Sequence, residues 1–129
     1  MGLAKVENWE ENLNAILRKV DIALEREFPD VATRHPVRPP SGTTASPQYD
    51  GLFRVTASFT AGFGSQLGRG YSIQVDCMSL NPPDLGKMRE IESRAVQLIT
   101  DLLPKAFPGR QLEVKQDGTQ WKIVGDLSL

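Results

Sequence analysis

The sequence has too few cysteines and histidines to build several common kinds of site. Cys77 is the only cysteine and His35 the only histidine among 129 residues. One cysteine excludes an internal disulfide and a multi-cysteine metal site. One histidine leaves a Ser-His-Asp triad or a histidine metal site to be built around His35 alone. We therefore expect no metal, no cofactor and no catalytic residues, and thus a protein that is not an enzyme.

Excess charge and long apolar runs are absent as well. The formal net charge is -1, whereas domains that grip nucleic acid usually carry a large basic excess, so nucleic acid is not an expected partner. No apolar run approaches the length of about 18 residues that spans a membrane. The start of the chain, MGLAKVENWEEN, lacks the apolar core of a signal peptide. These features favour one cytoplasmic domain, residues 1–129, without membrane contact.

A first helix is predicted from about Asn8 to Phe28. Asn8 and Glu11 match a capping box, and Pro29 ends the segment. Apolar residues at helical spacing predict its buried stripe: Trp9, Leu13, Ile16, Leu17, Val20 and Leu24.

A second helix is predicted after residue 80, with Asn81 as its cap and the two following prolines in its first turn. Pro104 kinks or stops this helix, and Gly109 closes the segment. Its predicted buried stripe is Met88, Ile91, Ala95, Leu98 and Leu102.

Strict alternation of apolar and polar residues predicts two strands, 52–61 and 71–80. Pairing Phe59 with Ile73 and Ala57 with Val75 keeps their apolar faces together. The opposite face of this hairpin would then be polar, with Arg54, Thr56, Ser58, Thr60, Ser72, Gln74 and Asp76.

A second hairpin is predicted around Asp117-Gly118, a strong signal for a two-residue turn. Counting outward from that turn gives favourable cross-strand pairs: Val114 with Trp121, Leu112 with Ile123, and Glu113 with Lys122.

The expected fold is therefore α+β, a two-layer sandwich with element order α-β-β-α-β-β. Two hairpins with one apolar face each need cover, and two helices with one apolar stripe each supply it. We expect a four-stranded, mainly antiparallel sheet with both helices packed on one face. Its edge strands would invite dimerisation by strand addition.

The glycine-rich stretch GFGSQLGRG, residues 62–70, allows two interpretations. It lies between two predicted strands, which favours a flexible hairpin loop whose glycines adopt positive φ. A Walker loop or a dinucleotide fingerprint would need a following helix. The alternative is a site for a small phosphorylated ligand or another anion, formed by Gly64, Ser65, Gly68 and Arg69.

A long proline-rich connection, residues 29–50, separates the first helix from the first strand. Its length is typical of functional or disordered loops. It is either a solvated connector or, as a second candidate site, a loop that binds a partner through Arg34, His35 and Arg38. Cys77 falls on the inward side of its strand, where we expect a buried, inert thiol.

No set of residues points to a reaction. The sequence therefore favours a small non-enzymatic binding or assembly module that self-associates, with a homodimer as the expected form. Its expected partners are proteins, including a second copy of itself.

Overall fold

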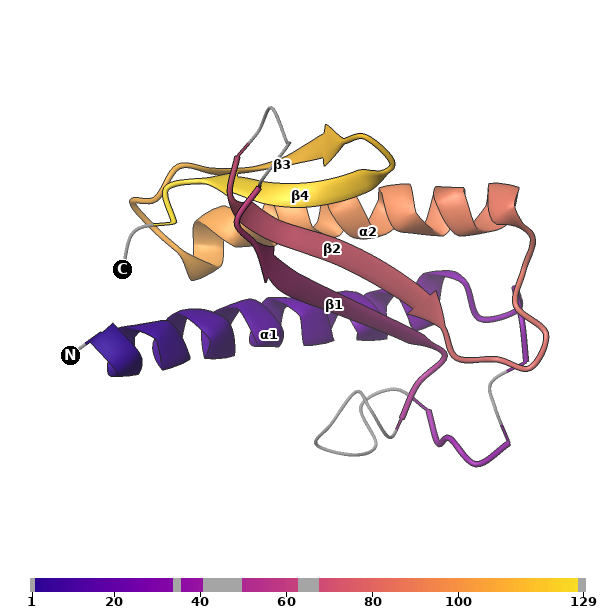
Figure 1. Ribbon diagram of the computed structural model, residues 1–129. Coiled ribbons are helices and arrows are strands. Elements are labelled where there is room, and N and C mark those ends of the chain that lie inside the picture. The colour runs from indigo at the N-terminus through magenta and orange to yellow at the C-terminus, as the bar shows by residue number, and fades with distance from the viewer. Residues whose placement is uncertain (1, 34–35, 41–49, 63–67, 128–129) are drawn as a thin grey trace.

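Two helices and four strands follow one another in the order helix, strand, strand, helix, strand, strand (Figure 1). The computed structural model describes residues 2–33, 36–40, 50–62 and 68–127. The elements are α1 (Gly2–Glu27), β1 (Phe53–Thr60), β2 (Gly70–Cys77), α2 (Leu85–Ala106), β3 (Leu112–Asp117) and β4 (Gln120–Gly125).

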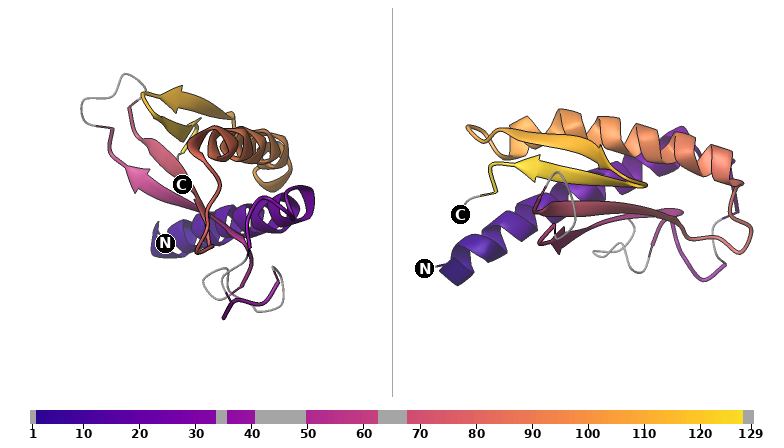
Figure 2. Two further views of the ribbon diagram at one scale, coloured as in Figure 1. Left: turned by 90° about the vertical axis from the view of Figure 1, so that its right-hand side faces the viewer. Right: turned by 45° about the horizontal axis from the view of Figure 1, so that its top comes forward.

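The strands form one antiparallel sheet in the order β1-β2-β4-β3, so β1 and β3 are its edges. Both helices pack on the same side of this sheet, as the end-on view in Figure 2 shows. No helix of the described residues covers the other side. This arrangement confirms the predicted α+β sandwich. None of the helices in the described residues has the length and apolar character that crossing a membrane requires.

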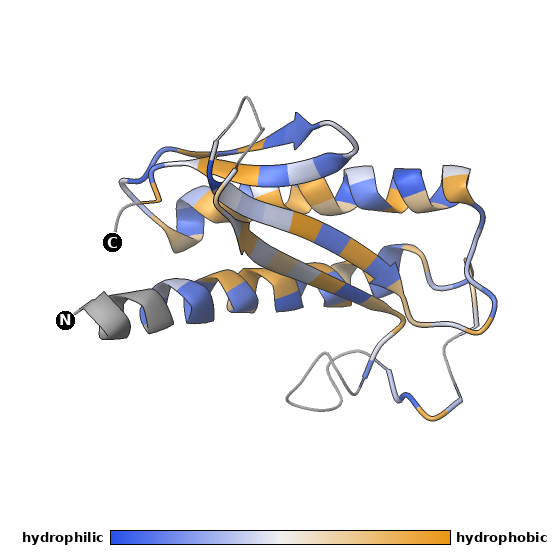
Figure 3. Ribbon diagram, in the orientation of Figure 1, coloured by the Kyte–Doolittle hydropathy of each residue, from blue (hydrophilic) through white to orange (hydrophobic). Residues whose placement is uncertain are grey.

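The core lies between the sheet and the two helices. Alternate strand residues such as Phe53, Val55, Ile73 and Ile123 point toward the helices and are buried. Figure 3 shows the matching alternation of apolar and polar residues along the strands. The predicted stripe of the first helix is confirmed, since all six of its residues are buried.

The first helix begins earlier than predicted. It starts at Gly2, so Asn8 lies inside it and is not its cap. Residues 3–7, LAKVE, continue the helix because they include good helix formers and contain neither glycine nor proline. The capping-box pattern was therefore a false signal. The end is close to the prediction, because the helix stops at Glu27, two residues before Pro29.

The second helix begins later than predicted. Asp84 is its N-cap, and the Asp84 carboxylate accepts a hydrogen bond from the Lys87 amide at 2.8 Å. Asn81 is therefore not the cap. The helix continues through Pro104 to Ala106. Its buried stripe keeps Ile91 and Ala95, but the predicted Met88, Leu98 and Leu102 are only half-buried, and the other buried residues are Val96, Ile99 and Leu103.

Both hairpins form with a register that differs by two residues from the prediction. In the first hairpin, Ala57 pairs with Ile73 and Phe59 with Tyr71. A shift of two leaves every side chain on its expected face, so alternation alone does not distinguish the two registers. The loop determines which register forms, because Gly62 packs against Gly68 and the hairpin closes at the pair Thr60 and Gly70.

In the second hairpin, the predicted partners Val114 and Trp121 separate, and Val114 pairs with Ile123. Leu112 accordingly pairs with Gly125, and Glu113 with Val124 instead of Lys122. The closing pair is Asp117 with Gln120, so Gly118 and Thr119 are the two central turn residues. Gly118 has φ 65°, and no non-glycine residue in the described ranges has positive φ. A glycine in the first central position alone suits a type II′ turn, which explains why the turn is one residue later than predicted.

Gly62 and Gly109 provide a matched test of this geometry. Both have positive φ, 80° and 83°, but a Cβ on Gly62 would lie 2.1 Å from the Gly68 carbonyl, whereas one on Gly109 would meet nothing within 4 Å. We expect Gly109→Ala to lower the free energy of unfolding by about 1 kcal/mol and Gly62→Ala by roughly 3 kcal/mol. Urea unfolding measures both, and equal losses would contradict the close approach of Gly62 to Gly68.

Candidate functional site

Charged side chains from α1 line the outer edge of β1. Arg18, Asp21 and Glu25 share one stripe of the helix because they are spaced by three and four residues. Asp21 Oδ1 accepts the Val55 N–H and Glu25 Oε1 accepts the Leu52 N–H, each at 2.7 Å. These carboxylates accept hydrogen bonds that the carbonyl groups of a neighbouring strand would otherwise accept. We call Arg18, Asp21, Glu25, Asp50 and the two amides they serve, Leu52 and Val55, the α1–β1 seam.

The strongest ion pair of the α1–β1 seam joins Arg18 to Asp50. Two parallel hydrogen bonds of 2.7 Å connect the guanidinium with the carboxylate. Asp50 has no exposed surface, and 19 % of the Arg18 side chain is exposed. The hydrogen bonds to Asp50 raise the pKa of Arg18 above its ordinary value. Because Asp50 ends the long connection, this pair pins the end of that connection to α1.

Asp21 is the most unusual group of the α1–β1 seam. It is 0 % exposed, and its second oxygen, Oδ2, finds no hydrogen-bond partner among the described residues. Burial raises the pKa of Asp21 from its ordinary 3.8 to about 7, although the Val55 N–H and the charge of Arg18 act in the opposite direction. The buried Arg54 Nε likewise lacks a partner in the described part of the chain.

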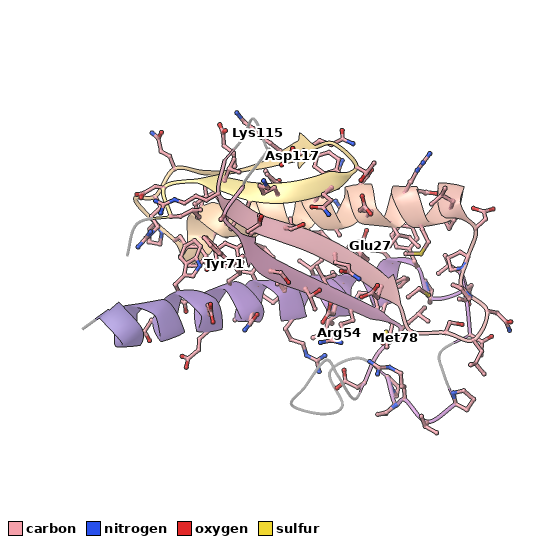
Figure 4. The ribbon with its side chains drawn as sticks, in the orientation of Figure 1. Glu27, Arg54, Tyr71, Met78, Lys115 and Asp117 are labelled. Atoms are coloured by element: carbon pink, nitrogen blue, oxygen red, sulfur yellow. The ribbon has the colours of Figure 1, made fainter. Side chains whose placement is uncertain are left out.

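A third buried charged residue, Lys122, lies on the helix-free side of the sheet. Its ammonium contacts Asp117 Oδ2 at 2.6 Å and donates to the Gly68 carbonyl oxygen at 3.0 Å. The Lys122 stem packs so close to Gly70 that a Cβ there would lie 2.7 Å from it. Lys122 therefore ties the end of the glycine-rich loop to the β3–β4 hairpin, near the labelled Lys115 and Asp117 of Figure 4.

The predicted anion site is only partly described. Gly64 and Ser65 lie outside the described residues. Gly68 has φ 75° and directs its carbonyl oxygen to Lys122, and Arg69 is exposed. The described part of the loop thus binds the Lys122 ammonium through a carbonyl oxygen. Anion binding by this loop stays a prediction.

The predicted partner-binding loop is also only partly described, because Arg34 and His35 lie outside the described residues. Arg38 Nε donates to the Gly51 carbonyl at 3.0 Å and Arg38 Nη2 to the Asp50 carbonyl at 2.5 Å. Arg38 therefore holds the loop against the start of β1. The described parts of the connection contain no strand.

Cys77 lies beside Arg38 at a shallow hollow. The hollow measures about 340 Å³ and is lined by Val37, Arg38, Cys77, Met78 and Ser79. Cys77 is half-buried and not fully buried as predicted, and this partial burial raises the pKa of its thiol. That shift disfavours the thiolate, the form that reacts with electrophiles and binds metals.

The acidic groups of the α1–β1 seam bind backbone amides and Arg18. No three or more histidine, cysteine, aspartate or glutamate side chains among the described residues are grouped so that they could hold a metal ion. The α1–β1 seam can hold two elements together and can exchange one proton near neutral pH through Asp21. No step of bond making follows from these contacts.

Sequence reasoning missed Asp21, Asp50 and Lys122 as buried residues. For Asp21 a signal was present, since it lies four residues after Leu17 and three before Leu24, within the apolar stripe. A charged residue at such a position needs a buried partner. Asp50 and Lys122 carry no comparable signal, because their burial depends on contacts with residues distant in sequence.

Comparison with known proteins places the chain in a family. It belongs to the family whose model is described as "Uncharacterised protein" and matches residues 4–125. A protein of Borreliella burgdorferi, described as "Uncharacterized protein", is 38% identical over 125 residues, which cover 97% of this chain and 98% of that protein. No solved structure matches the chain significantly.

The contribution of the Arg18–Asp50 pair can be measured against an exposed pair of the same kind. Asp50→Asn leaves the Arg18 guanidinium without its counterion and should lower the free energy of unfolding by about 3 kcal/mol. The control is Glu27→Gln, which breaks the half-exposed pair with Arg94 and should cost less than about 1 kcal/mol. If urea unfolding gives equal losses, the Arg18–Asp50 pair does not pin the connection.

Asp21 makes stability depend on pH. Between pH 4 and 7 the folded protein keeps a proton that the unfolded chain has released, so stability falls as pH rises through this window. From the shift of 3.8 to about 7, the fall reaches about 4 kcal/mol at most. Asp21→Asn should remove this slope, since its amide oxygen can still accept the Val55 N–H. Urea unfolding at a series of pH values compares the two proteins; parallel curves would show that Asp21 does not titrate near neutrality.

Proposed function

We propose that the protein is a non-enzymatic binding or assembly module that associates with itself. Its buried and half-buried charged groups support this proposal through their contacts: Asp21 and the half-buried Glu25 accept hydrogen bonds from backbone amides, Asp50 holds Arg18, and Lys122 holds a loop. Each of these charges is occupied in joining two elements of the fold. We therefore look for a binding site on the parts of the sheet that no helix of the described residues covers.

One observation carries the proposal, namely the exposure of Phe59 at the end of β1. Its side chain is 57% exposed, although it stands on the apolar side of an edge strand. Its ring contacts Tyr71 edge-on, with the centroids 5.6 Å apart, so the ring has a fixed place on the surface. Aromatic residues are enriched in the cores of protein interfaces, where an ordered ring buries a large area.

The helix-free face of the sheet is the second uncovered surface. Its β1–β2 half presents hydroxyl and amide side chains such as Thr56, Ser58 and Gln74, and its β3–β4 half carries charged residues such as Lys115 and Lys122. Among the described residues of the four strands, this face has none of the aromatic platforms on which RNA-binding sheets stack bases, which favours a protein partner. A cytoplasmic location remains a sequence-based prediction. The same holds for the binding of a small phosphorylated ligand at residues 62–70.

Sedimentation across a concentration series tests the proposal. We expect the weight-average mass to rise from 14.3 kDa toward twice that value as the concentration increases from about 5 to 200 μM, the range in which interfaces of modest affinity saturate. A constant monomer mass over the whole series would contradict self-association.

A further inference from the structure

The hydrogen-bonding groups of β1 point alternately to β2 and to the open edge. The Val55 N–H bonds to Asp21 on α1, so it points away from β2. In an antiparallel pair this direction recurs at every second residue, which places the N–H and C=O groups of Ala57 and Phe59 on the open edge too. Nothing else among the described residues takes up these groups. The edge of β1 is thus covered by α1 at Val55 and open beyond it.

We propose that the open end of β1, residues 56–60, pairs antiparallel with the same segment of a second copy of this chain. The inference rests on the proposed self-association and names its interface. A two-fold axis at Ser58 sets Ala57 opposite Phe59 of the partner subunit, and Phe59 opposite Ala57 of the partner subunit. Each of these two pairs exchanges two backbone hydrogen bonds.

The extent of the pairing follows from which outward N–H groups of β1 are available. The next pair with outward-pointing groups would join Val55 to Ala61 of the partner subunit, but the Val55 N–H already donates a hydrogen bond to Asp21. The pairing therefore ends where α1 begins to cover the strand. The two sheets would join into one of eight strands across the axis.

The side chains on both faces of this pairing are compatible with a copy of themselves. On the helix side, each Phe59 ring would lie over Ala57 of the other chain, which covers its exposed surface. On the helix-free side, Ser58 meets its own copy and Thr60 meets Thr56 of the other chain. No charged side chain lies in Ala57–Thr60, so the two-fold axis brings no like charges together.

The opposite edge of the sheet is less suited to this role. β3 carries Glu113 and Lys115, both exposed and paired with each other at 3.2 Å, and Figure 4 shows Lys115 at this margin. Charged residues on edge strands are a common protection against strand addition. The contrast between a charged β3 and an uncharged end of β1 supports β1 as the interface.

A proline at each edge tests the interface. Ala57→Pro removes one outward N–H of β1 without touching the β1–β2 hydrogen bonds, and a proline is tolerated at such an edge position. The control is Gln116→Pro on β3. Its N–H also points outward, because the closing pair Asp117 and Gln120 uses the alternate groups. In the concentration series, Ala57→Pro should remain a monomer and Gln116→Pro should associate as the unchanged protein does.

A cysteine at the proposed axis gives a second readout that does not depend on the proline variant folding. In a Cys77→Ser background, Ser58→Cys should form an intermolecular disulfide under mild oxidation, because facing residues in such a pair have Cα atoms about 4.5 Å apart. Ser72→Cys, on the neighbouring strand and the same face, should not. If the unchanged protein associates while Ala57→Pro also associates or the two cysteines react alike, the β1 interface is wrong and self-association stands. If the unchanged protein stays monomeric, both proposals fail.

Discussion

An edge strand needs acceptors for its outward N–H groups, and in this protein a helix supplies acceptors near the start of the strand. α1 runs along β1 and offers two carboxylates to the amides of Leu52 and Val55. The same stripe of the helix holds Asp50 through Arg18. The docking of α1, the end of the long connection and the start of the sheet are therefore joined in one seam, while the far end of β1 remains uncovered.

Buried charges in this fold stand where separate elements meet. Asp21 lies between helix and strand, Asp50 between helix and connection, and Lys122 between two hairpins. Burying a charge is unfavourable unless it is paired or hydrogen-bonded, so each of these contacts specifies one arrangement of its elements against alternatives. The alternation and the apolar stripes would tolerate a hairpin shifted by two residues. A lysine that must reach both Asp117 and the Gly68 carbonyl does not tolerate such a shift.

Sequence patterns predicted the fold class and most of the core, because the period of an amphipathic segment directly records which face is buried. The stripe of α1 and the inward residues of β1 and β2 follow from that period. The helix starts were predicted wrongly because asparagine is a common N-cap residue, which made Asn8 and Asn81 candidates. Whether such a residue caps a helix depends on whether the residues before it are themselves helical. The hairpin registers were missed because they depend on loop closure at Gly62 and on the turn at Gly118.

The candidate site was harder to predict than the fold. Of the residues expected to bind a ligand or a partner, Arg38 has contacts that fasten the loop, and Gly68 offers an oxygen to Lys122. The α1–β1 seam itself depends on pairs distant in sequence, such as Arg18 with Asp50, which no local pattern reveals. Phe59 was predicted to lie on the apolar face, but its exposure of 57% is a property of the folded chain that the alternation of the strand does not reveal.

Hydrogen exchange at single amides of β1 tests the central claim most directly, namely that α1 covers the start of this edge strand and leaves its far end open. In dilute solution, where the chain is a monomer, the account predicts that the amides of Leu52 and Val55 exchange as slowly as amides paired within the sheet. It predicts fast exchange for Ala57 and Phe59. Fast exchange at Val55, or protection at Ala57 in the dilute monomer, would contradict it.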